Sequence, residues 1–193
     1  MIITLFLKAY LKITIVYIII MLIFSLSSLL NYSSNSETII FKIPLEFYAR
    51  EFLIHGLFGT LVGLFTFKPS LIILSTTFAI LTDIDHTLWL NGMSTIARTN
   101  HAIPISIVIS IIMGLIFRNK KKINYRLTFT IFGAMLSHLA YDSISEYQPI
   151  PILSPITLEE ITLLDNSWIV LLLVAILVNI IGLLIYKKNI SKK

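Results

Sequence analysis

The chain has no cysteine and little charge of either sign. Only 13% of its 193 residues are charged, 56% are hydrophobic, and the mean hydropathy is +0.90. The absence of cysteine excludes disulfides and thiolate metal sites, and it leaves His, Asp and Glu as the strong metal ligands. Soluble domains carry about a quarter charged residues. The composition therefore predicts an integral membrane protein, and the length allows one domain.

Long apolar runs recur along the chain. A membrane-spanning helix needs about 20 mostly apolar residues. Six segments come near this length, at 13–30, 50–67, 69–85, 102–117, 127–145 and 167–186. Because the third is short, we expect an all-α polytopic membrane protein with about five to six transmembrane helices. The first helix could instead belong to a signal peptide, since Lys8 and Lys12 precede its apolar run and small residues follow it.

These segments suggest three regions. Residues 1–30 form an N-terminal transmembrane helix or signal peptide, residues 50–160 form the core, and residues 167–193 form a C-terminal transmembrane helix with a basic tail.

The basic residues are distributed unevenly about these segments. If the N-terminus is cytoplasmic and the segments alternate, the cytoplasmic side holds all of the 15 lysines and arginines except Lys42, Arg50 and Arg98. Such a bias sets membrane orientation. We therefore expect both termini in the cytoplasm of a cell-membrane protein. The basic run at 118–122 is interpreted as a topology anchor rather than as a nucleic-acid site.

The ionisable residues of the opposite, outer side are unusual. In the stretch AILTDIDHTLWL, residues 79–90, an apolar run ends in Asp83, Asp85 and His86. These three residues either mark a helix end that meets water or bind a ligand. All four histidines of the chain fall in this outer half, at four separate helix ends: His55, His86, His101 and His138. We predict a polar His/Asp cluster at the outer ends of the helices.

Two of these histidines have informative neighbours. His138 and Asp142 are four residues apart, so they share one face of a helix and could serve one ion or form a buried hydrogen bond. His55 heads a stripe of small residues, Gly59 and Gly63, that lets another helix approach closely. Taken alone, His55 could be a packing residue and His101 an interfacial one.

Together the histidines and aspartates indicate a metal site. Neutral imidazole with carboxylate is the ligand set of zinc and similar ions. Without a metal, several charges would be partly buried with few cationic partners. We expect one to three divalent ions, with zinc favoured.

The order of the motifs resembles a known family. The motifs are His55-x-x-x-Gly59, Asp83-x-Asp85-His86, Arg98-x-x-His101 and His138-x-x-x-Asp142. They resemble the membrane-bound, predicted metal-dependent hydrolases, whose bacterial members include a LexA-regulated inner-membrane protein. More distantly, this family is similar to the zinc-dependent phospholipase C and P1 nuclease group. The resemblance covers about residues 50–160. The chain departs from the family pattern at Thr82, Asn100 and Ala102.

The resemblance implies a phosphoester hydrolase acting on a membrane lipid or lipid-linked substrate at the outer surface, with a metal-activated water. The implied metal ligands are His55, Asp85, His86, His101, His138 and Asp142. Asp83 is a ligand or a general base. Arg98 binds a phosphate oxygen or anchors the protein at the interface.

Other functions stay open from the sequence. A His/Asp cluster could form an ion or proton pathway of a transporter. An intramembrane amide hydrolase of the ceramidase kind also uses His and Asp with zinc. The departures at Thr82, Asn100 and Ala102 are compatible with a structural membrane protein that has a degenerate site. The sequence does not predict the oligomeric state.

Overall fold

The protein is a bundle of helices. The computed structural model describes residues 2–27, 45–84, 99–118, 122–145, 150–157, 161, 163 and 166–190. Its α-helices are α1 (Ile2–Ser27), α2 (Leu45–Leu64), α3 (Pro69–Leu81), α5 (Ile103–Ile116), α6 (Tyr125–Ser145) and α7 (Ser167–Ile190), and a 3-10 turn, η2 (Thr99–His101), precedes α5. Within these ranges no strand occurs, and an isolated antiparallel bridge joins Ile150 and Ile161. The predicted all-α class is confirmed.

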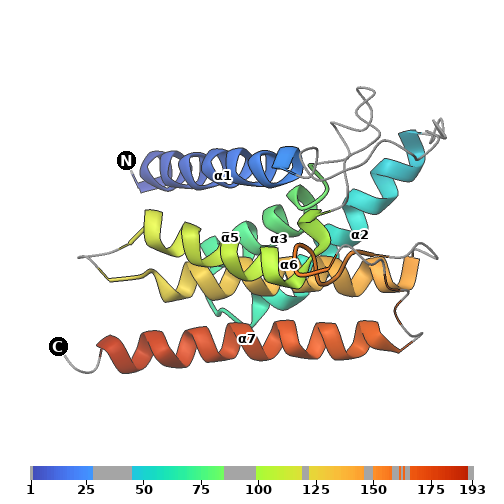
Figure 1. Cartoon of the computed structure of the whole chain (residues 1–193). Helices are drawn as coiled ribbons and strands as arrows, with labels where there is room; N and C mark the ends of the chain where they lie inside the picture. The colour runs from blue at the N-terminus through green and yellow to red at the C-terminus, as the bar shows by residue number, and fades with distance from the viewer. Residues whose placement is uncertain are drawn as a thin grey trace.

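Helix α6 is the centre of the bundle. It packs against α2, α3, α5 and α7, whereas α1 lies across α3, α5 and η2. Figure 1 shows α1 and α7 on opposite sides of the bundle, with both chain termini at the same end. The opposite end of the bundle gathers the end of α3, the start of α5 and the end of α6 (Figure 1). Helix ends that are distant in sequence therefore meet at one place.

The α2–α3 pair is fixed by small residues and a proline. Pro69 occupies the first turn of α3, where its missing N–H costs no hydrogen bond, and Lys68 before it is extended. A Cβ atom on Gly59 would lie 2.8 Å from the carbonyl oxygen of Ser75, whose hydroxyl donates a 2.8 Å hydrogen bond to the carbonyl of Gly59. The predicted close approach at the small-residue stripe is confirmed.

Helix α1 contributes to the core of the bundle. Tyr17 and Met21 are fully buried, and the Tyr17 ring lies 4.5 Å from the Phe78 ring of α3. The Asn100 amide donates a 2.7 Å hydrogen bond to the Ser25 hydroxyl. Helix α1 is thus tied both to α3 and to the turn that carries His101.

Among the described residues, two helices are long and apolar enough to cross a membrane, at Thr4–Leu26 in α1 and Ser167–Asn189 in α7. They support a membrane location. Our count of about five to six spanning helices is too high by this criterion. The reason is length for α3 and α5, which have 13 and 14 residues, and polarity for α2 and α6, which are long enough but carry the ionisable residues.

Candidate metal centre

Five of the predicted site residues converge in the interior. His55 comes from α2, Asp83 follows the end of α3, His101 ends η2, and His138 and Asp142 lie one turn apart on α6. Each of the five is at most 5% exposed. Asp83 and His101 lie at helix ends, and His138 and Asp142 lie in the last two turns of α6. His55 lies in the middle of α2, so the expected placement of every histidine at a helix end is wrong for His55. Buried ionisable groups are costly unless they pair with each other or hold an ion.

The ring of His138 is oriented by the backbone of α3. Its Nδ1 lies 2.7 Å from the carbonyl oxygen of Ala79. Because a carbonyl oxygen only accepts, Nδ1 carries the proton and donates it. In the neutral ring the lone pair is then on Nε2, which points into the cluster. Metal-binding histidines are commonly held in this way by a second hydrogen bond.

Another imidazole nitrogen and two carboxylate oxygens lie close to this Nε2 atom. It lies 3.0 Å from Nε2 of His101, 3.3 Å from Oδ1 of Asp83 and 3.2 Å from Oδ2 of Asp142. His101 Nε2 in turn lies 3.1 Å and 3.4 Å from the same two oxygens. Lone pairs and carboxylates at these separations repel one another unless a positive charge lies between them. A proton or a metal ion supplies that charge.

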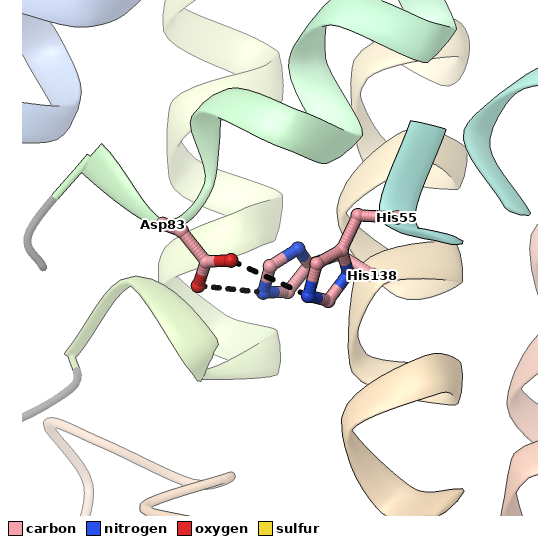
Figure 2. Close-up of side chains that lie close together, drawn as sticks. All are labelled: His55, Asp83 and His138. Carbon is pink, nitrogen blue, oxygen red and sulfur yellow. Dashed lines mark ion pairs between the residues drawn. The ribbon is translucent and has the colours of Figure 1, made fainter. Parts of the chain in front are cut away.

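His55 faces the same carboxylates from the other side. Its Nε2 lies 3.3 Å from Oδ2 of Asp83 and 3.4 Å from Oδ1 of Asp142. Figure 2 shows Asp83 facing both His55 and His138, one carboxylate oxygen toward each ring. The His55 ring stacks on that of His138, and Tyr141 contacts its edge. The ring packing fixes the direction of each imidazole.

The spacing of these atoms fits a metal ion. Ligand bonds of 2.0–2.1 Å in a tetrahedral site separate the ligand atoms by about 3.3 Å. Five of the cluster's nitrogen–oxygen distances lie between 3.2 and 3.4 Å, longer than the 2.9–3.0 Å typical of an N–H···O hydrogen bond. Two groups of three residues have their ligand atoms within 4.8 Å of one another: His55, Asp83 and His138, and also His101, His138 and Asp142.

Sequence reasoning missed Glu51. Its carboxylate is buried in α2, with Oε2 3.9 Å from Nε2 of His55 and Oε1 accepting a 3.1 Å hydrogen bond from the Tyr141 hydroxyl. The guanidinium of Arg50 lies 3.5 Å from Oε1, but its side chain is 63% exposed. The signal was available, because Glu51 and His55 have the same four-residue spacing as His138 and Asp142.

The imidazoles and carboxylates whose side chains the structure describes all lie here. They belong to His55, His101 and His138 and to Glu51, Asp83 and Asp142; the side chain of Glu46, in the first turn of α2, is outside the described ones. Such segregation in one buried place indicates a site rather than scattered helix ends.

The positions that depart from the family pattern serve packing. The Thr82 hydroxyl donates a 2.9 Å hydrogen bond to the carbonyl of Phe78 and lies 3.4 Å from the Tyr17 hydroxyl. Asn100 bonds Ser25 of α1. Ala102 is fully buried, and its carbonyl accepts a hydrogen bond from Ser106. Two of the three positions therefore face α1.

The remaining predicted site residues, Asp85, His86 and Arg98, lie outside the described residues, and their roles stay predictions. The family resemblance likewise rests on the motifs alone. Comparisons with protein-family models, with curated proteins and with solved structures found no match to this chain.

Proposed function

We propose that the chain is a membrane-embedded, metal-dependent hydrolase that cleaves a phosphoester of a lipid or lipid-linked substrate. The observation that carries the proposal is the buried convergence of three imidazole Nε2 atoms and two carboxylates. Nitrogen and oxygen ligands without thiolates suit zinc or a similar divalent ion. The order of the motifs, which resembles the membrane-bound hydrolases, adds the reaction class.

The described residues would provide a rigid, dry ligand set. A divalent ion bound there would act as a Lewis acid and activate a water molecule. His138 is held by Ala79 with its lone pair facing the centre. Asp83 turns both oxygens toward imidazoles, which favours a role as ligand over one as general base. Asp85 and His86 would complete the ligands, and Arg98 would bind a phosphate oxygen.

The placement of the site supports a lipid substrate. Helices α1 and α7 flank the bundle, and both termini lie at one end (Figure 1). That end carries Lys187 and Lys188 in the last turn of α7, and basic residues favour the cytoplasmic side. We place the cluster at the outer end, near the lipid headgroups. Large apolar side chains are exposed on α2 and α5, among them Leu53, Leu57, Ile111 and Leu115, so we propose that the whole bundle is embedded.

The proposal is tested by incubating purified protein with liposomes of mixed phospholipids and supplied zinc. We expect release of a phosphorylated headgroup or of phosphate, detected by mass spectrometry and abolished by chelator and by Asp142→Asn. Release of fatty acid from ceramide, without a phosphorus-containing product, would replace the phosphoesterase with the amide hydrolase. Proton or ion flux without any product would replace both with a transporter.

A further inference from the structure

The stacked rings of His55 and His138 have a consequence for metal binding. Their centroids are 3.8 Å apart and their planes differ by only 12°. An imidazole binds a metal along the Nε2 lone pair, which lies in the plane of the ring, at about 2.0–2.1 Å. Because the two ring planes are nearly parallel, they do not intersect within about 2.1 Å of both Nε2 atoms. One ion therefore cannot be bound in plane by both His55 and His138.

His101 and His138 are arranged differently. Their planes differ by 60°, and their Nε2 atoms are 3.0 Å apart. Two planes at this angle, with the nitrogens this close, allow both lone pairs to point to one position. The geometry separates the imidazoles into a pair, His101 with His138, and a single ring, His55.

The two aspartates follow the same division. Oδ1 of Asp83 and Oδ2 of Asp142 face the His101–His138 pair. The other oxygen of each carboxylate, Oδ2 of Asp83 and Oδ1 of Asp142, faces His55. A carboxylate that presents one oxygen to each side can bridge two ions, as in two-metal hydrolytic sites.

We infer that the cluster forms two metal positions bridged by Asp83 and Asp142, and that Glu51 is the terminal carboxylate ligand of the His55 position. Glu51 Oε2 lies 3.9 Å from His55 Nε2, while Tyr141 holds the other oxygen. The inference rests on the metal centre of the proposed function.

The charge of the cluster agrees with two ions. Glu51, Asp83 and Asp142 are buried and carry three negative charges together. One divalent cation leaves these groups with a net charge of −1, and two leave +1, when the three imidazoles are neutral. With Asp85, the further ligand proposed above, two divalent cations bring the site to neutrality and one leaves −2. The carboxylate charge therefore matches two divalent ions better than one.

The test counts ions in the wild-type protein and in Glu51→Gln, which removes the charge at nearly constant shape. Detergent-purified protein is titrated with Mn²⁺, free ion is removed, and bound metal is measured by mass spectrometry together with the electron paramagnetic resonance spectrum. We expect about two ions in the wild type, with the spin coupling that bridged ions show, and about one uncoupled ion in the variant.

Three results would overturn the inference. Two ions of unchanged affinity in Glu51→Gln would exclude Glu51 as a ligand. A single ion in the wild type would exclude the second position and leave the proposed metal centre standing. A folded wild type that binds no ion would remove both proposals.

Two further variants keep the test interpretable. Thr60→Val alters the same helix five residues from His55 and should still bind two ions; its hydroxyl bonds Gly56 and Thr76 rather than the cluster. If Glu51→Gln does not fold, Glu51→Asp retracts the carboxylate by one methylene. We then expect the weaker of the two dissociation constants to rise about 10-fold or more, and an unchanged constant would contradict the role of Glu51.

Discussion

The imidazole of His138 donates a hydrogen bond of 2.7 Å from Nδ1 to the main-chain carbonyl of Ala79. This bond joins the central helix α6 to the last turn of α3, four residues before Asp83. The His138 side chain thus connects α6 to α3 and also directs its Nε2 atom into the cluster. The two roles can be separated by mutation.

His138→Asn should retain the fold and lose the ligand. The asparagine amide can donate near the position of Nδ1, but nothing replaces Nε2. His138→Ala loses both roles and leaves the Ala79 carbonyl buried and unsatisfied. We expect metal-free His138→Ala to be less stable than metal-free His138→Asn by about 1–3 kcal/mol, measured by denaturant unfolding in detergent. Equal stability of the two variants would show that the bond to Ala79 contributes nothing.

Gly59→Ala should disturb the cluster from a distance. The added Cβ would lie 2.6 Å from the Ala79 Cβ and 2.8 Å from the Ser75 carbonyl oxygen, so α3 must move away from α2. We expect a loss of about 1–3 kcal/mol in unfolding free energy and weaker metal binding. Gly56→Ala is the matched control, because its Cβ would meet side-chain atoms and no backbone, with Ile80 Cδ1 at 3.2 Å and Thr76 Cγ2 at 3.6 Å. Similar losses at both glycines would contradict the close approach.

Metal removal should lower thermal stability only while the carboxylates are intact. An ion present at 100 times its dissociation constant stabilises by about 2.7 kcal/mol, which corresponds to roughly 5–10 °C for a chain of this size. Chelator should therefore lower the unfolding midpoint of the wild type by about that amount. Asp142→Asn should show little change with chelator, and its metal-free form should be at least as stable as the metal-free wild type, since a crowded negative charge is gone. A chelator shift in Asp142→Asn as large as in the wild type would count against the assignment of Asp142.

The Ser25–Asn100 hydrogen bond should couple α1 to the site. Ser25 of α1 accepts from Asn100, the neighbour of His101. A double-mutant cycle with Ser25→Ala and Asn100→Ala should give a coupling free energy of about 0.5–1.5 kcal/mol, and both single variants should bind metal more weakly. Ser143→Ala on α6, whose hydroxyl bonds its own helix, is the control. Additive effects would mean that the bond does not couple α1 to η2.

The helices and most of the convergence were predictable from the sequence. All six apolar segments correspond to helices, and α3 is the shortest of them, as expected. The four-residue spacing of His138 and Asp142 places both on one face of a regular helix. Gly59 predicted a close helix contact because only a small residue allows one. These features are local or periodic, so they can be inferred directly from the sequence.

The organisation of the centre was not predictable. The four-residue spacing of Glu51 and His55 was visible in the sequence, but the hydrogen bond that Glu51 accepts from Tyr141 of a different helix was not. The stacking of His55 on His138 depends on how α2 and α6 cross. The number of spanning helices was overestimated for two reasons. An apolar run does not show where its helix stops, as α3 does at Leu81, and α2 and α6 carry ionisable residues. Each of these features depends on tertiary structure.

The most direct test of the central claim is the metal content of detergent-purified protein, prepared without chelator, beside His138→Asn and Thr60→Val. We predict that the wild type and Thr60→Val carry zinc or a similar divalent ion and that His138→Asn, still folded, loses it. A folded wild type that holds no metal even after zinc is supplied would contradict the account. The cluster would then be a set of imidazoles and carboxylates that share protons.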